Sequence, residues 1–211
     1  MTNVQPAALL RPKPVVTDDP AAHIHGFPRG SITEIHGPAS SGRTSLMVGA
    51  LAEAAAAGEI CALVDTDDAF DPVSGAAAGL PLDRLLWVRC GHNAEHALRV
   101  ADLLVQSGGF GFLVFDLGDT PPRTANRISL TSWYRLRRAI EPTRTVMVVV
   151  SREPWARQAA SLSLSLSREE VWWRGATPPH SCLLEAIATV MERRKPAGPA
   201  TRELYPARAL G

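Results

Sequence analysis

The residues with the clearest chemistry in this 211-residue chain form a glycine-rich loop between Gly37 and Ser45. Gly37 and Gly42 have the spacing of a phosphate-binding loop, in which backbone N–H groups surround phosphate oxygens at the start of a helix. Thr44 stands where a hydroxyl would bind Mg²⁺. The residues predicted to bind nucleotide are Gly37, Ser40, Ser41, Gly42, Arg43, Thr44 and Ser45.

The loop departs from the usual pattern at Arg43, where a lysine is expected. The planar guanidinium is longer and bulkier than an ammonium, so it cannot take the same place without displacing another group. Either the loop still binds phosphate, or it is retained only for packing. Because the glycines, Thr44 and the strand–helix context are all present, we favour phosphate binding, with ATP or ADP and Mg²⁺ as ligands.

A second candidate is Asp116, which ends a wholly apolar strand predicted over Phe110–Phe115. A carboxylate in that place can hold Mg²⁺ through water, which would add Asp116 to Thr44 as a metal residue. The alternative is a strand-end aspartate that caps the following turn.

Arginines and tryptophans form a third group. Arg135 and Arg138 lie on a helix predicted from about Asn126 to Ile140, where they could bind phosphates or simply form a solvated face. Exposed Trp and Arg are enriched in protein interfaces, and aromatic rings stack on single-stranded DNA. The other candidates for DNA or partner contact, with core packing as the alternative for the tryptophans, are Arg152, Trp155, Arg157, Trp172 and Arg174.

The elements around these residues alternate between strands and helices. The strands lack a polar face, and the segments between them have helical spacing, which indicates a mainly parallel sheet covered by helices on both sides. The predicted strands are Ser31–Ile35, Ile60–Asp65, Leu85–Arg89, Phe110–Phe115 and Thr145–Val150. The fold class is therefore α/β.

The last third of the chain has a different pattern. Ala159–Ser167 alternates with period two, as a half-buried strand does, and could form a hairpin with Glu170–Trp173. We expect antiparallel strands appended to the C-terminal end of the parallel core. The expected divisions are a Pro-rich arm or linker at 1–30, a core domain at 31–195, and a loose tail with at most one short strand at 196–211.

Composition excludes several classes of protein. The formal net charge is +1, so overall charge does not indicate a nucleic-acid or membrane partner. The cysteines Cys61, Cys90 and Cys182 lie far apart in apolar runs, which is typical of buried core residues. The chain shows no signal-peptide pattern and no apolar run that could span a bilayer. We expect a cytoplasmic protein.

Together, several stretches resemble the core of RecA, the bacterial recombinase, in order and with near-family spacing. They cover about residues 27–195 and imply a RecA-like P-loop NTPase fold. The matching stretches are Phe27–Gly30, Gly37–Ser45, Cys61–Pro72, Leu82–Val88, Glu95–Gly108, the strand ending at Asp116, and Leu183–Arg194.

The resemblance also defines departures. Arg43 replaces the RecA lysine that reaches the phosphates, and Asp67 stands where RecA has the glutamate that activates water. Because its side chain is one methylene shorter, this carboxylate would lie about 1 Å or more from the position needed for catalysis. Ser151 and Arg152 replace the RecA glutamine that senses the γ-phosphate. Asp71 matches a RecA residue near the adenine, although an Asp-Pro turn explains it almost as well.

These departures imply weak or absent hydrolysis, with Asp67 as the catalytic residue of any remaining activity. The chain most resembles the ImuA type, the RecA-related accessory proteins of the damage-inducible (SOS) translesion mutagenesis cassette. That resemblance implies docking onto RecA or a translesion polymerase assembly, with single-stranded DNA as a further ligand. The alternatives are an active DNA-dependent ATPase of homologous recombination and a cell-division inhibitor of the SulA type.

Overall fold

A computed structural model describes residues 23–24, 26–174 and 183–206. Its main sheet has eight strands in the order β10-β9-β8-β3-β7-β6-β4-β5. The strands are β3 (Ser31–His36), β4 (Cys61–Asp65), β5 (Leu85–Arg89), β6 (Phe112–Asp116), β7 (Val146–Ser151), β8 (Leu162–Arg174), β9 (Leu183–Lys195) and β10 (Ala197–Pro206).

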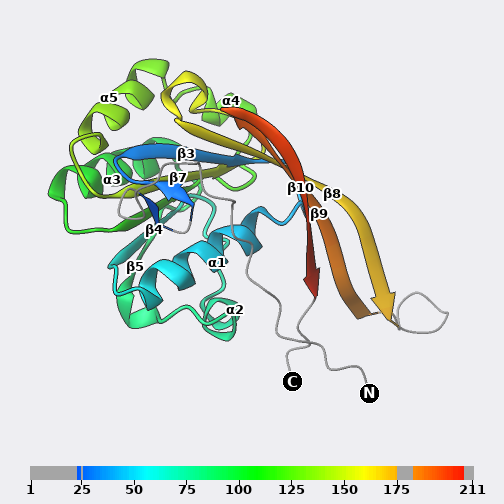
Figure 1. The fold of residues 1–211 in the computed structure, drawn as a ribbon. Coiled ribbons are helices and arrows are strands. Elements are labelled where there is room, and N and C mark those ends of the chain that lie inside the picture. Colours follow the sequence, from blue (N-terminus) through cyan, green and yellow to red (C-terminus); the bar gives the residue numbers. More distant parts are fainter. Residues whose placement is uncertain (1–22, 25, 175–182, 207–211) are drawn as a thin grey trace.

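Strands β3 to β8 pair in parallel with their neighbours, whereas β8, β9 and β10 pair antiparallel. This confirms the predicted α/β fold with antiparallel strands at the C-terminal end. Helices cover both faces of the sheet (Figure 1). The helices are α1 (Arg43–Ala56), α2 (Pro72–Ala77), α3 (Ala94–Ser107), α4 (Pro122–Ala125) and α5 (Leu130–Ile140), with short 3-10 turns η2 (Leu82–Arg84) and η3 (Arg157–Ala159).

Two hydrophobic cores hold the layers together, one on each face of the sheet. Strand β6 is apolar on both sides because each side packs in a core. Phe112 and Val114 face the core under α1, while Leu113 and Phe115 face the core under α3 and α5. All residues of β4, β6 and β7 are buried. Successive side chains of a strand point to opposite faces, so a strand covered on both sides has no polar face.

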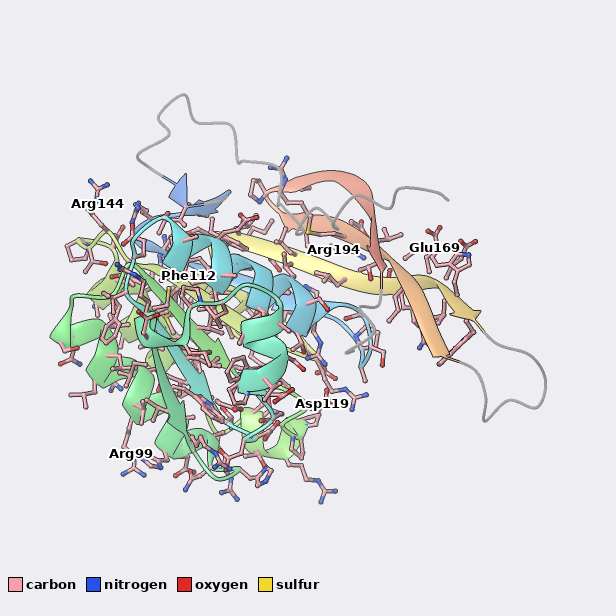
Figure 2. The ribbon with its side chains drawn as sticks, turned by 90° about the horizontal axis from the view of Figure 1, so that it is seen from below. Arg99, Phe112, Asp119, Arg144, Glu169 and Arg194 are labelled. Carbon is pink, nitrogen blue, oxygen red and sulfur yellow. The ribbon has the colours of Figure 1, made fainter. Side chains whose placement is uncertain are left out.

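The last strands extend beyond the other layers. Strand β3 pairs with β8 only from Leu162 to Ser165, whereas β9 pairs with β8 as far as Arg174. The outer part of the β8–β9–β10 ribbon therefore projects from the body of the molecule (Figure 1). Figure 2 shows Glu169 on this projection, far from Phe112 in the body.

The predicted hairpin through Arg168-Glu169 is wrong, because residues 162–174 form one continuous strand. The pairing partner of β8 is β9, and a register shift between Arg168 and Glu170 absorbs the irregularity that suggested a turn. The leucines of the alternating segment are buried on the α1 side, as the period of two indicated.

Short and long strands are present near both ends of the described chain. Phe27, in the short strand β2 (Phe27–Pro28), is fully buried and packs edge-on against Phe112. Strand β2 pairs with β1 (His23–Ile24). At the other end, β10 is a ten-residue strand where a tail with at most one short strand was expected.

Two further points concern the class of protein. Within the described ranges, no helix combines the length and apolar character needed to cross a membrane. Cys61 and Cys90 are buried free thiols, and burial raises the pKa of Cys61 to about 12. Cys182 lies outside the described residues.

Candidate phosphate-binding site

The candidate site lies at the carboxyl ends of the parallel strands. The glycine-rich loop follows β3, and Asp116 ends β6, next to β7 in the sheet. Parallel pairing brings the ends of these strands to one edge, which is where ligands bind in open α/β sheets. Residues far apart in the sequence therefore meet beside the start of α1.

The loop has the backbone that a phosphate cradle requires. Gly42 precedes α1 with φ 91°, and Ser40 has φ 58°, both in the left-handed region. A side chain at Gly37 would place its Cβ 2.1 Å from the backbone oxygen of Leu166, so only glycine fits there. The hydroxyl of Ser41 is buried and has no hydrogen-bond partner among the described residues. An anion at the start of this 14-residue helix would supply an acceptor for it.

Arg43 does not point into solvent but reaches across the site to the loop that follows β6. Its Nη1 donates to the Gly118 carbonyl oxygen at 3.0 Å, and its Nη2 donates to Asp119 Oδ1 at 2.9 Å. The Arg43 side chain is only 9% exposed, whereas that of Asp119 is 55% exposed. The arginine is thus a buried cation whose counter-ion belongs to the same chain.

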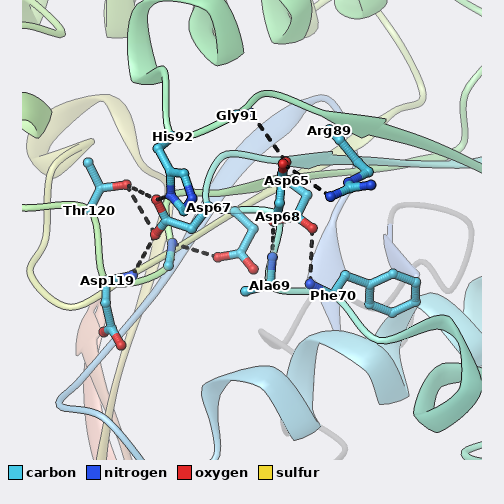
Figure 3. Close-up of polar contacts among 12 residues, drawn as sticks. Asp65, Asp67, Asp68, Ala69, Phe70, Arg89, Gly91, His92, Asp119 and Thr120 are labelled. Atoms are coloured by element: carbon cyan, nitrogen blue, oxygen red, sulfur yellow. Dashed lines mark hydrogen bonds and ion pairs between the residues drawn. The ribbon is translucent and has the colours of Figure 1, made fainter.

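Asp67 is also engaged within the chain (Figure 3). Its carboxylate accepts from the Asp119 backbone N–H at 3.1 Å and from Thr120 Oγ1 at 3.3 Å. Nδ1 of the exposed His92 lies 3.6 Å from Asp67 Oδ1. These contacts occupy two of the acceptor sites of the carboxylate and fix its position against the neighbouring loop.

Asp116 sits deeper in the site. One of its oxygens accepts from the Gly118 N–H at 2.7 Å, which is the turn-capping contact considered for it. Burial raises the pKa of Asp116 to about 7, and the negative charges of Asp65 and Asp67 act in the same direction. Thr44 and Asp116 line the same cavity, so a hydroxyl and a carboxylate are available to a Mg²⁺ ion that phosphate and water would complete.

The cavity has a volume of about 230 Å³. Phe70 forms part of its wall because Asp65 accepts from the Phe70 N–H at 3.0 Å and holds the chain after β4. The lining residues are Arg43, Thr44, Met47, Asp67, Ala69, Phe70, Asp116, Gly118, Asp119 and Val150. Among the described residues there is no group of three or more His, Cys, Asp or Glu side chains placed to hold a metal by themselves.

Asp71 is not brought to this cavity. It is the N-cap of α2, where its side chain accepts from the backbone N–H groups of Val73 and Ser74. The hydrogen bonds from Ser74 and Val73 lower the pKa of Asp71. This arrangement matches the Asp-Pro turn that was the alternative to a nucleotide contact.

The predicted contact residues occupy different environments. Arg135 pairs with Asp102 at 3.3 Å, and Arg138 is exposed on α5. Arg152 joins the site, because its Nε lies 3.7 Å from Asp119 Oδ1. Trp155 is buried in the core under α3 and α5.

Further along, Arg157 is exposed in η3, and Trp172 is partly exposed on the projecting part of β8. The side chain of Arg174 is outside the described side chains. The neighbour of Trp172, Trp173, is 61% exposed and lies on the same part of β8.

Four residues of the site were missed from the sequence. Gly118, Asp119, Thr120 and His92 contact Arg43 or Asp67, yet none belongs to a recognisable motif. The available signal was the position of Asp119, three residues beyond the strand-end Asp116. Loops at the carboxyl ends of parallel strands commonly supply site residues.

Glu34 connects the strand before the loop to the segment after β7. It is fully buried in β3, and its Oε1 accepts from the Ala156 N–H at 2.6 Å. Burial raises the pKa of Glu34, and the backbone N–H groups of Ala156, Trp155 and Arg157 act against that rise. Its Oε2 has no partner among the described residues.

Comparisons with known proteins agree with this geometry. Residues 13–122 match the family model of the RecA N-terminal domain. Protein RecA of Chloroflexus aurantiacus is 35% identical over 148 residues, covering 64% of this chain and 42% of that protein. Protein RecA of Deinococcus radiodurans is 34% identical over 148 residues, covering 64% of this chain and 40% of that protein.

A third relative, protein RecA of Bacteroides thetaiotaomicron, is 33% identical over 146 residues, covering 63% of this chain and 44% of that protein. The chain spans less than half the length of these curated relatives. Among solved structures, the crystal structure of the RadB recombinase superposes with a TM-score of 0.59 at 18% identity, covering 87% of this chain and 93% of that one. At that identity the likeness concerns the fold alone.

Proposed function

The chain belongs to the RecA N-terminal domain family, and from that premise we propose that it is an accessory protein of DNA-damage tolerance, with residues 31–195 as its core domain. It binds RecA or a translesion polymerase assembly in the cytoplasm during damage-induced mutagenesis. Nucleotide is a structural or switching ligand for it, and hydrolysis is weak or absent.

The observation that carries this proposal is the internal use of the groups that hydrolysis would need. Arg43 is paired with Asp119, and Asp67 anchors the backbone of Asp119 and the hydroxyl of Thr120. At the end of β7, the Ser151 hydroxyl donates to the Glu153 carbonyl oxygen at 2.7 Å, so it serves the backbone. Losing several positioned groups together leaves little catalysis, because such groups act as a unit.

Retained phosphate binding has separate support. Gly37 and Gly42 keep their backbone roles, and the buried Ser41 hydroxyl lacks a partner in the described chain. The first turn of α1 contains no acidic residue, so the positive end of the helix is not neutralised there. We propose ATP or ADP as the ligand, with Thr44 and Asp116 holding Mg²⁺.

The projecting ribbon is the proposed partner surface. Trp172 and Trp173 are adjacent on β8 and are 38% and 61% exposed. Exposed tryptophans are suited to partner binding, because a tryptophan buries a large surface when a partner covers it. On the side of β8 away from β9, the described pairing with β3 stops at Ser165. An extended segment of a partner protein could add to this edge, with the tryptophans as anchors.

The test measures binding of the purified full chain to RecA and to the polymerase proteins of the same organism, immobilised on a sensor. We expect micromolar or tighter binding that Trp173→Ala weakens at least about ten-fold. Leu103→Ala is the matched control, because Leu103 is 67% exposed but lies on α3, outside the ribbon. Binding of single-stranded DNA alone, with none to either protein, would contradict the proposal.

A second candidate, an active DNA-dependent ATPase of recombination, fits the family relationship equally well. The specific observation in its favour is the cavity of about 230 Å³ beside the loop, lined by Thr44 and Asp116. Single-stranded DNA that stimulates ATP turnover would favour this candidate. Absence of any nucleotide binding would instead favour a pure interaction module, such as a division inhibitor.

A further inference from the structure

We propose that Asp119 is a displaceable internal anion, which occupies Arg43 until a phosphate takes its place. The inference rests on the proposed function, because it assumes that the loop still has affinity for phosphate. Asp119 then determines how tightly the site binds an anionic ligand. Arg43, which stands in place of the usual lysine, and Asp119 thus act as a pair in controlling phosphate binding.

The asymmetry of burial shows which partner can leave. The Arg43 side chain is 9% exposed and the Asp119 side chain 55% exposed. A buried guanidinium needs an anion beside it, whereas a half-exposed carboxylate is readily solvated when it turns away. A phosphate oxygen would satisfy Arg43 as well as a carboxylate does, because it can accept the Nη2 hydrogen bond that Asp119 accepts now.

Asp119 also has a second cation within reach. Arg152 Nε lies 3.7 Å from Asp119 Oδ1, and the Arg152 side chain is 53% exposed. Because this ion pair is already present, the carboxylate keeps Arg152 as its counter-ion when phosphate occupies Arg43.

The backbone of the loop after β6 is held independently of this exchange. The Asp119 N–H remains bonded to Asp67, and the Gly118 N–H remains bonded to Asp116. Only the Asp119 side chain has to move. A substitution that keeps the backbone and removes the charge, such as Asp119→Asn, therefore isolates the competition.

The experiment measures the affinity of the full chain for inorganic tripolyphosphate by calorimetry, without divalent cations so that Asp119 cannot act through a metal. We expect Asp119→Asn to bind roughly five- to ten-fold more tightly than the wild type. Asp119→Glu, which keeps the charge, should return the affinity toward the wild-type value. Glu153→Gln removes one exposed charge from the segment after β7 and should change the affinity less than two-fold.

Thermal unfolding provides the second readout. Asp119→Asn should lower the melting temperature in buffer, because Arg43 loses its anion, and tripolyphosphate should raise it more in the variant than in the wild type. A merely structural role for Asp119 would lower the melting temperature without tightening the binding. Equal affinities, weaker binding by Asp119→Asn, or no binding by either protein would overturn the proposal.

These outcomes are distinct from those that decide the proposed function. Equal tripolyphosphate affinities would overturn the exchange at Arg43 but would leave binding to RecA or a polymerase unaffected. Turnover of ATP stimulated by single-stranded DNA would contradict the accessory role, whatever the affinity of Asp119→Asn.

Discussion

Individual side chains decide what this site can do, and two of them separate phosphate binding from hydrolysis. Arg43 and Asp67 both make their contacts with the segment Gly118–Thr120. Both side chains are therefore engaged with the same loop of this chain. The backbone groups of the proposed phosphate cradle, at the glycines and the start of α1, are formed without these contacts.

Restoring the lysine should therefore not restore activity. We expect Arg43→Lys to hydrolyse ATP no faster than the wild type, because Asp67 stays bonded to the Asp119 N–H and to Thr120. Phosphate release over several hours measures this, and calorimetry with ATP confirms that the variant still binds. A gain of about ten-fold or more in turnover would mean that Asp67 is a competent base and that Arg43 alone blocks the reaction.

Glu34 gives a pH-dependent prediction. Burial raises the pKa of Glu34 above the ordinary carboxyl pKa. The contribution of Glu34 to stability is therefore complete at pH values below the ordinary pKa, and it is lost as the pH rises through the raised pKa. The free energy of unfolding should fall within that window by at most about 1.4 kcal/mol per pH unit. Glu34→Gln cannot ionise and should lose less stability over the same range.

Denaturant unfolding of both proteins between pH 5 and pH 8 measures the effect. The difference between the two curves isolates Glu34, because His36 and Asp116, whose pKa values are also shifted, are present in both. If the free energy of unfolding changes with pH equally in both proteins, ionisation of Glu34 does not destabilise the folded state.

At the scale of elements, the phosphate loop is built into the sheet as a tightly packed turn. The Gly37 N–H donates to the Ser151 carbonyl oxygen at 3.3 Å, which ties the loop to β7. On its other side, Gly37 abuts the Leu166 backbone of β8. The loop thus joins the parallel part of the sheet to the antiparallel ribbon.

Gly37→Ala should be strongly destabilising. Its Cβ would lie 2.1 Å from a backbone oxygen and 2.9 Å from Ser41 Oγ, so the loop or β8 must shift. We expect a loss of about 2–4 kcal/mol in the free energy of unfolding. Gly58→Ala is the control, because φ is +92° there but nothing lies within 4 Å of the added atom, and it should cost only about 1 kcal/mol.

Chemical denaturation of both variants tests the comparison. Equal losses at Gly37 and Gly58 would show that backbone conformation, and not the contact with β8, limits position 37.

Elements with a strong period could be predicted from the sequence. The apolar run of β6 and the helical spacing between the predicted strands both led to the correct type of element, because burial on two faces or on one leaves a distinct pattern. The hairpin at Arg168-Glu169 was wrong because two charged residues in a projecting strand resemble a turn. A register shift at that point leaves no sequence signal distinct from that of a loop.

For the whole molecule, the family and the sheet could be predicted, but the contacts inside the site could not. Arg43 and Asp119 are 76 positions apart, and Asp67 and Thr120 are 53 positions apart. The contact of Asp67 depends on how β4 and β6 align, and that of Arg43 on how β3 and β6 lie on either side of β7. The sequence was therefore sufficient to locate the glycine-rich loop but not to predict which groups Arg43 contacts.

The molecule combines a RecA-type core with a projecting three-strand ribbon (Figure 1). The core retains a cavity at the carboxyl ends of its strands, and the ribbon carries exposed tryptophans away from it. The proposed ligand site and the proposed partner surface therefore lie in separate parts of the chain. Substitutions in one part should leave the function of the other largely unchanged.

The most direct test of the accessory role is the rate of ATP hydrolysis by the wild-type chain, measured as phosphate release with and without single-stranded DNA. Protein RecA of the same organism serves as the positive control under identical conditions. We expect calorimetry to detect ATP binding, and we expect turnover to stay at background with and without DNA. Hydrolysis that DNA stimulates toward the rate of the RecA control would contradict the assignment of Arg43 and Asp67 to internal contacts and would identify an active recombination ATPase.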